Sequence, residues 1–263
     1  MGIGNQLGAL THRNIVKNLR NPDIVVFATA APVAFALLFA FVFGSAMEMG
    51  GDLYREFLLV GILAQTMLMT STNTGVGLAM DNKEGMMDRF RSLPVRPAAV
   101  LTARTNSDLV VNLIVIAVLS LVGLAMGWRI RSGPWEALAG FGLLLLFAYA
   151  LSWASAYIGL KVRSPEVLSN VSMLILLPLA FISTAFVPTD GMPTPMRIAA
   201  EWNPVSAVVT GVRELFGNVP GSVTTPDILP LQYPALAGLA WSLLLLGVFI
   251  PLATRSYVRS HTR

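Results

Sequence analysis

Six long stretches of the chain contain no aspartate, glutamate, lysine or arginine, and short charged segments separate them. These uncharged stretches are residues 24–47, 57–80, 109–128, 137–160, 167–189 and 228–254. A helix rises about 1.5 Å per residue, so about 20 apolar residues cross the hydrocarbon core of a bilayer. The pattern predicts an all-α integral membrane protein with one transmembrane domain over residues 1–263, and with six spans at about 24–46, 57–80, 107–127, 138–160, 167–187 and 233–254.

Residues 1–23 precede the first span and predict a helix at the membrane interface. Their apolar side chains fall on two faces, so we expect this helix to bend near its middle. The two sets are Ile3, Leu7 and Leu10, and Ile15, Val16 and Leu19. Pro22 opens the first span, while Pro32 and Pro178 lie within spans, where proline is tolerated and can kink the helix.

The longest connection, residues 188–232, contains two helix starts. Thr194-Pro195 and Asn203-Pro204 each place a capping residue before a proline, and Gly217 can end the second helix. Both helices are too short to cross a membrane. Over about 194–217 we expect a re-entrant helical hairpin before the last span. The alternative is an amphipathic pair that lies on the outer surface.

Charge sets the expected topology. The chain is 55% hydrophobic and 12% charged, with a formal charge of +4. With six spans, thirteen of the lysines and arginines fall on the side of both termini and five on the other. The positive-inside rule therefore predicts that both termini are cytoplasmic, although Arg129 and Arg131 in the external loop after the third span run against it. The basic residues lack the interleaved aromatics of a nucleic-acid surface, so no nucleic-acid partner is expected.

Several kinds of chemistry have no residues to carry them. The chain has no cysteine, its two histidines lie near opposite ends, and none of its three lysines follows glycine. The phosphate-binding loop GxxxxGK[ST] is therefore absent, and we expect no catalytic residues, metal site or cofactor in this chain. Asp108 is expected at the start of the third span, near the cytoplasmic face. Without an acid at mid-membrane an ion-coupled carrier is disfavoured, but backbone carbonyls of broken helices can also bind cations.

The spans do contain uncharged polar and small residues. In the second span these are Gln65, Thr66, Thr70 and Asn73, in the fourth Ser152 and Ser155, and in the third the pair Gly123 and Gly127. Such residues most often serve helix packing, because small side chains allow close approach and hydroxyls or amides bond across helices. The alternative is that the four residues of the second span form a weakly polar path for an amphiphilic substrate.

The densest charge cluster lies between the second and third spans. Its apolar residues Met86, Met87, Phe90 and Leu93 share one helical face, which predicts a short amphipathic helix over about 83–93. Asp81 or Asn82 can cap its start, Pro94 stops it, and Pro97 suits the start of the next helix. The alternative is a solvated connector that packs at the membrane interface.

Two motifs carry a resemblance to a known family. The run "KEGMMDRFRSLPVRPAAVLTAR" resembles the cytoplasmic motif in the membrane subunits of type-two ABC exporters, in the group of the daunorubicin-resistance permease. Further along, "FISTAFVPTDGMP" and "AEWNPVSAVVTGVRELFGN" are similar to that family's turn and its later helix with an arginine. The resemblance covers nearly the whole chain.

The resemblance implies six spans, an interfacial N-terminal helix, a cytoplasmic coupling helix and re-entrant helices, in a bacterial inner membrane. It also implies two separate ATPase subunits that use ATP and magnesium, and a second permease copy as homodimer or related heterodimer. By the same resemblance, the ATPase-coupling residues are Glu84, Asp88, Arg89, Phe90 and Arg91. The re-entrant hairpin would contain Asn203, Pro204, Arg213 and Glu214.

Three functions follow as hypotheses. The first is the permease subunit of an ATP-driven exporter that moves a hydrophobic or amphiphilic compound, such as a drug, natural product or lipid-linked molecule, out of the cytoplasm. The alternative is a stand-alone secondary carrier for a hydrophobic solute. A membrane enzyme acting on lipids is disfavoured, because the sequence has no cluster of catalytic acids, histidines or metal ligands.

Overall fold

A computed structural model describes residues 8, 11–16, 22–43, 51–85, 97–162, 164–186, 189, 192–219 and 228–259. Within these residues the regular structure is helical and no strand occurs. The longer elements are α2 (Pro22–Leu38), which continues as the π-helix η1 (Phe39–Phe43), α3 (Gly51–Thr70), α4 (Thr72–Lys83), α6 (Pro97–Ala125), α7 (Pro134–Gly159), α8 (Pro165–Phe181) and α12 (Pro234–Arg259). The shorter ones are α9 (Thr194–Glu201), α10 (Pro204–Phe216) and α11 (Leu229–Gln232).

Local sequence signals account for where several helices begin and end. Proline is the first residue of α6, α7, α8, α10 and α12. At this position an N–H group would have no hydrogen-bond partner within the helix, so proline costs no bond. Ser164 precedes α8, and its hydroxyl oxygen accepts a hydrogen bond from the Val167 amide at 3.4 Å. Gly217 ends α10 with a φ of 69°, so the expected glycine C-cap is confirmed.

Among the described residues, three helices are long and apolar enough to cross a membrane by length and composition: Ala99–Ala125, Pro134–Gly159 and Pro234–Val258. Ala28–Phe41 and Pro165–Phe181 are shorter apolar helices. Large apolar side chains on α8 and α12 point outward, among them Leu174 and Leu236. Because a lipid-facing surface is apolar, these features identify a multi-pass membrane protein, and the count of six spans stays a prediction.

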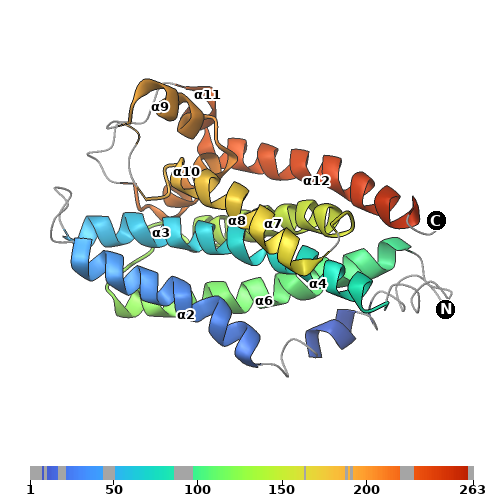
Figure 1. The fold of residues 1–263 in the computed structure, drawn as a ribbon. Coiled ribbons are helices and arrows are strands. Elements are labelled where there is room, and N and C mark those ends of the chain that lie inside the picture. Colours follow the sequence, from blue (N-terminus) through green and yellow to red (C-terminus); the bar gives the residue numbers. More distant parts are fainter. Residues whose placement is uncertain are drawn as a thin grey trace.

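α7 forms the centre of the bundle and packs against α12, α4 and α10. The long helices run roughly parallel to one axis, while α9 and α11 lie to one side near one end (Figure 1). Gly159 of α7 faces Gly75 of α4 so closely that a Cβ on either glycine would overlap backbone atoms of the partner helix. Between them Ser155 accepts a hydrogen bond from the Gly75 amide at 3.2 Å and donates one to the Thr72 carbonyl at 3.1 Å.

These contacts identify Ser155 as a packing residue. Gly123 and Gly127 do not form one helix-packing motif. Gly123 packs against Leu59, whereas Gly127 follows the end of α6 and has a φ of 98°. Gly127 therefore belongs to the turn that leaves the helix, where a positive φ favours glycine.

α6 begins at Pro97, as expected for the helix that leads into the third span, so Asp108 lies about three turns into the helix. The structure changes two other local expectations. Asp81 and Asn82 lie within the last turns of α4 and do not cap a new helix. Thr194 is already the first helical residue of α9, and Pro193 takes the capping position without a side-chain hydrogen bond.

Candidate functional site

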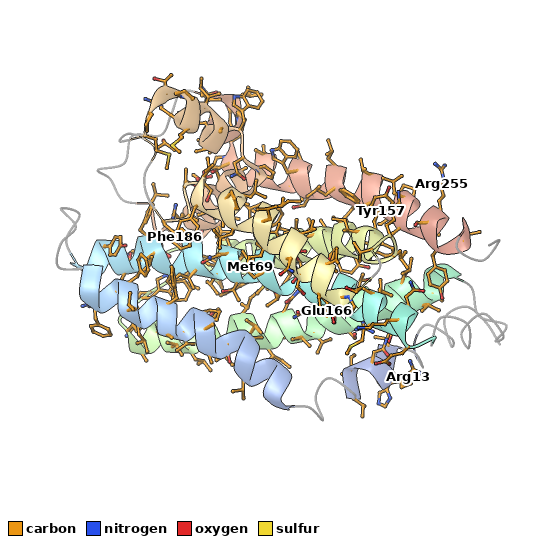
Figure 2. All side chains as sticks on the ribbon, viewed as in Figure 1. Arg13, Met69, Tyr157, Glu166, Phe186 and Arg255 are labelled. Atoms are coloured by element: carbon orange, nitrogen blue, oxygen red, sulfur yellow. The ribbon has the colours of Figure 1, made fainter. Side chains whose placement is uncertain are left out.

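A cavity of about 690 Å³ lies between α2, the continuous pair α3 and α4, and α6. Ser71 joins α3 to α4 with helical backbone angles, and its amide still bonds to the Met67 carbonyl at 3.2 Å, so one unbroken wall faces the cavity. Met69 of α3, labelled in Figure 2, is one of the lining residues. A cavity of this volume is within the range of about 300–1,000 Å³ that holds drug-sized ligands.

The four polar residues expected along the second span all line this cavity: Gln65, Thr66, Thr70 and Asn73. Thr66 donates its hydroxyl proton to the Ile62 carbonyl at 2.7 Å, and Thr70 donates to the Thr66 carbonyl at 2.9 Å. Because these protons bond within the helix, the two hydroxyl oxygens can act toward the cavity only as acceptors.

A second polar row comes from α6 and was not expected. Arg104, Asp108 and Asn112 follow one another at a spacing of four residues, so they share one face of the helix, and all three line the cavity. Thr74 of α4 donates a hydrogen bond to the Asp108 carboxylate at 2.5 Å. Asn112 is 2% exposed, and its Nδ2 has no hydrogen-bond partner in the described part of the chain.

The third wall is apolar. α2 contributes Ala28, Ala31, Pro32 and Phe35, and Val111 of α6 adds to the same lining. Phe35 stacks at 4.2 Å between ring centroids on Phe39 of the π-helix, which holds this wall in place. One side of the cavity is therefore polar and the other apolar, an arrangement that suits an amphiphilic molecule.

An ion pair connects the cavity with the end of α4. Arg104 Nη1 lies 2.9 Å from Asp81 Oδ2, and both side chains are largely buried. The guanidinium lies so close to Gly77 that any side chain there would overlap it. Two residues after Asp81, Lys83 lies 3.4 Å from Glu166 at the start of α8, although both of these side chains are mostly exposed.

The expected coupling segment is only partly described. Lys83 is the last residue of α4, Glu84 is exposed, and Gly85 turns the chain with a φ of 68°. Residues 83–85 therefore end α4 instead of starting a separate helix. Asp88, Arg89, Phe90 and Arg91 lie outside the described residues.

The residues expected in the re-entrant hairpin hold α10 within the bundle. Asn203 caps α10, since its Oδ1 accepts from the Val205 amide at 2.8 Å, and its Nδ2 donates to the carbonyls of Leu179 at 2.7 Å and Ile182 at 2.5 Å. Pro204 is the first residue of the helix. Glu214 is exposed, one residue from the buried Arg213.

Arg213 is 3% exposed and binds backbone carbonyls of two other segments. It donates to Phe57 of α3 at 3.2 and 2.9 Å, to Thr184 at 2.7 Å and to Ala185 at 2.8 Å. Its guanidinium carbon also lies 3.4 Å from the centroid of the Phe57 ring, a cation–π distance. One side chain thus joins α10, α3 and the turn after α8.

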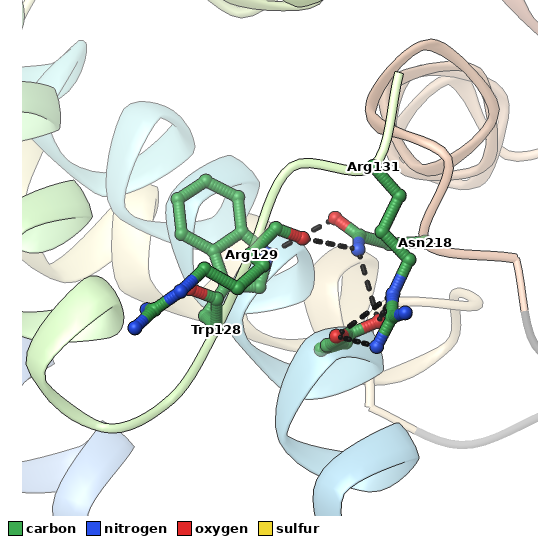
Figure 3. A network of polar contacts seen from close by, with 5 residues as sticks. Trp128, Arg129, Arg131 and Asn218 are labelled. Atoms are coloured by element: carbon green, nitrogen blue, oxygen red, sulfur yellow. Dashed lines mark hydrogen bonds and ion pairs between the residues drawn. The ribbon is translucent and has the colours of Figure 1, made fainter.

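A polar network joins the loop after α6 with the end of α10 (Figure 3). Arg131 binds the buried Glu56 carboxylate through Nη2 at 2.7 Å and through Nε at 3.1 and 3.0 Å. Asn218 donates to Glu56 at 3.1 Å and to the Arg129 carbonyl at 2.9 Å, and it accepts from Trp128 Nε1 at 3.0 Å. This pairing explains how Arg131 is accommodated in a loop where the charge pattern disfavours it.

The arrangement can hold a molecule between α2, α3, α4 and α6. Within the described ranges no group of three or more His, Cys, Asp or Glu side chains could hold a metal ion. The polar groups of the cavity are mainly amides and hydroxyls, together with Arg104 and Asp108. Such groups can recognise hydrogen-bonding partners on a bound molecule.

Comparisons with known proteins agree with this picture. Residues 5–216 match the family described as ABC-2 type transporter. The chain is 32% identical over 235 residues to the daunorubicin resistance ABC transporter permease protein DrrB1 of Streptomyces coeruleorubidus, with 89% of this chain and 78% of the relative covered. It is 26% identical to the putative transport permease ycf38 of Cyanophora paradoxa, covering 81% and 74%. It is 23% identical to the probable doxorubicin resistance ABC transporter permease protein DrrC of Mycobacterium tuberculosis, covering 86% and 81%.

Proposed function

Because the chain belongs to the ABC-2 type transporter family, we propose that it is the permease subunit of an exporter for a hydrophobic or amphiphilic compound. The cargo would be a drug, a natural product or a lipid-linked molecule. The observation that carries this proposal is the cavity of about 690 Å³ with one apolar and two partly polar walls. The names of two relatives, which refer to daunorubicin and doxorubicin resistance, support a cargo of this kind.

The assembly we propose has four subunits. Two separate ATPase subunits bind ATP and magnesium and supply the energy, since the sequence has no phosphate-binding loop of its own. A second permease copy, identical or related, completes the membrane part. We place the chain in the bacterial inner membrane, with six spans and both termini in the cytoplasm. In support, Arg13 and Arg255 lie toward the same end of the bundle, and Phe186 lies toward the other (Figure 2).

We further propose that the segment after α4 couples the ATPase to the cavity through Glu84, Asp88, Arg89, Phe90 and Arg91. Two ion pairs support this path, because both start from the last turns of α4. Asp81 binds Arg104 in the cavity wall, and Lys83 binds Glu166 at the start of α8. A displacement of the coupling segment would therefore reach α6 and α8 directly.

The hairpin of α9 and α10 is proposed to be re-entrant, entering from the outer side and returning to it. The burial of α10 supports this arrangement, since its residues pack against α12, α7 and α3. Backbone carbonyls inside a membrane have no water to bond with. Asn203 and Arg213 donate hydrogen bonds to such carbonyls, those of Leu179 and Ala185, in place of water. α9 is mostly exposed, with Met196 and Ile198 on its outer surface and the exposed Trp202 directly after it.

The test is daunorubicin export by bacterial cells that express the permease together with an ATPase encoded beside it. We expect Phe90→Ala and Arg91→Ala to abolish most of the export, because the apolar side chain and its neighbouring charge would no longer transmit movement. Asn82→Ala, at an exposed position in α4, is the matched control and should export normally. Normal export with normal stimulation of ATP hydrolysis in both variants would refute the coupling assignment.

A stand-alone secondary carrier is the second candidate, and one observation favours it. Asp108 lies about three turns inside α6, is 8% exposed and lines the cavity. Ion-coupled carriers use buried acids of this kind as proton or cation sites. The family assignment outweighs this observation, and gradient-driven flux by the chain alone would reverse that judgement.

A further inference from the structure

We propose that Gln65 and Asn73 bind the cargo directly, and that their side-chain amides hold two uncharged, oxygen-bearing groups of one amphiphilic molecule. The molecule would lie along the cavity wall with its apolar body between these two groups. This inference rests on the proposed export function and adds to it the contact residues, the orientation of the cargo and the chemistry of its polar groups.

Gln65 and Asn73 are the accessible amides of the cavity wall. Both residues line the cavity, and the Gln65 side chain is half-buried while that of Asn73 is exposed. Surrounding atoms enclose the Asn112 amide nitrogen, whereas neither amide atom of Gln65 is closed off in this way. Gln65 and Asn73 make no side-chain hydrogen bond to any other described residue. Their amides are therefore open to a molecule in the cavity.

The depth of Gln65 in the bundle makes a polar partner in the cavity necessary. α3 and α4 form one continuous helix from Gly51 to Lys83, and Gln65 lies near its middle. A helix of this length is long enough to cross the hydrocarbon core, whose lipid offers no partner to an amide. A polar group without a partner there is costly. Water can satisfy this amide when the cavity is empty, and polar groups of the cargo take the place of water when it binds.

The spacing of the two amides sets the orientation of the cargo. The residues are eight positions apart, which corresponds to about 12 Å along the helix, and Met69 lines the cavity between them. Ala28, Pro32 and Phe35 of α2 form the apolar wall of the same cavity. A molecule held at both amides therefore lies along α3 and α4 with its apolar body against α2.

The hydrogen-bonding capacity of the wall sets the chemistry of the polar groups. A side-chain amide both donates and accepts, so it can bind hydroxyl and carbonyl oxygens alike. The charged lining residues already have partners on α4, since Arg104 binds Asp81 at 2.9 Å and Asp108 accepts from Thr74. The two accessible amides thus match uncharged hydroxyl or carbonyl groups on the cargo.

The first measurement is the affinity for daunorubicin, whose fused rings carry oxygen-bearing groups at both ends. Its fluorescence polarisation reports binding to the complete transporter in lipid nanodiscs. We expect Gln65→Leu and Asn73→Leu each to raise the Kd about tenfold, the loss of about one hydrogen bond, and the double variant to raise it about a hundredfold. The aglycone, which lacks the charged amino sugar, should respond by the same factors. Asn82→Leu, at an exposed position of α4 outside the cavity lining, is the matched control and should bind like the parent.

The second measurement locates the bound molecule and uses the absence of cysteine in the chain. Gln65→Cys and Asn73→Cys each place a single thiol at one of the two contact positions, and Asn82→Cys places one outside the cavity. We expect a small maleimide to label all three thiols in the empty transporter. Saturating daunorubicin should protect the thiols at both contact positions and leave the third unprotected.

Two results would overturn the inference. Parent-like affinity of both leucine variants would show that the amides hold water and no cargo. Equal labelling of the two contact thiols with and without daunorubicin, or no labelling without it, would show that the molecule does not bind along this wall. If a leucine variant does not assemble, the cysteine measurement decides alone.

Export of daunorubicin by cells that express the parent transporter separates these failures from a failure of the proposed function. Export together with parent-like leucine variants or unprotected thiols refutes only the site. Absence of both export and binding refutes the assigned cargo and, with it, the contacts proposed for Gln65 and Asn73.

Discussion

Arg213 shows how a full charge can be kept inside an apolar bundle. Its guanidinium gives four hydrogen bonds to carbonyls of Phe57, Thr184 and Ala185, and its face stacks on the Phe57 ring. The planar fork of arginine can reach several acceptors at once, which a lysine ammonium cannot reproduce. The residue therefore fixes the position of α10 against α3 and the turn that follows α8.

Removing this side chain should destabilise the protein. Arg213→Ala would leave three carbonyl groups without their donor and open a gap in the bundle. We expect a loss of about 3 kcal/mol in folding free energy, seen as a thermal midpoint lower by roughly 5–10 °C in detergent. Glu214→Ala, at the neighbouring exposed position, should change the midpoint little. Equal midpoints for both variants would show that Arg213 does not hold α10.

The sequence predicts the polar residues that α3 and α4 contribute to the cavity, but not those of α6. Gln65, Thr66, Thr70 and Asn73 stand out because they are polar residues inside an uncharged run. Arg104 and Asp108 looked like the boundary of a span, since a charge normally ends an apolar stretch. Only the contacts of α4 with α6 show that Asp81 and Thr74 satisfy these groups within the bundle. The four-residue spacing of Arg104, Asp108 and Asn112 was the available signal.

Among the elements, the contact of α4 with α7 depends most clearly on single residues. Gly75 and Gly159 bring the two helix backbones together, and Ser155 bonds to both the Gly75 amide and the Thr72 carbonyl. Small residues allow this close approach. In lipid the hydrophobic effect does not drive helices together, so the dispersion contacts made at the crossing stabilise their association. The position of α4, and with it of Asp81, follows from this crossing.

Gly159→Ala should therefore push α4 away from α7. The added methyl group would overlap the backbone of Gly75, and overpacking of this kind costs about 1–3 kcal/mol. Gly142→Ala in the same helix is the control, because nothing lies within 4 Å of a Cβ there. It should be neutral or stabilise by up to about 1 kcal/mol through helix propensity. Thermal unfolding in detergent compares the two, and a more stable Gly159→Ala variant would contradict the close crossing.

Element boundaries were predictable where a local signal exists. Proline starts α10 after the Asn203 cap, and Gly217 ends it, as the sequence indicated. The start of α6 at Pro97 also agrees with the expected role of that proline, although the span was placed ten residues later. The difference arises because hydropathy marks the apolar core of a span, whereas the helix continues through polar residues that pack against α4.

At the scale of the whole molecule, a drug-sized cavity and an ion pair at its edge lie in a protein with no nucleotide-binding loop of its own. The cavity lining comes from α2, α3, α4 and α6 of a single chain, so each copy in a pair would carry its own site. Asp81 and Arg104 place the end of α4 in contact with the cavity wall. The shape of the cavity therefore depends on the end of α4, the segment that we propose contacts the ATPase.

We propose that the energy for transport comes from a separate ATPase. The most direct test is daunorubicin flux in proteoliposomes that contain the purified permease, with or without the ATPase subunits. We predict flux only when the ATPase, ATP and magnesium are all present, and no flux when the permease alone is given a proton or sodium gradient. Gradient-driven flux by the permease alone would contradict the account and identify a secondary carrier instead.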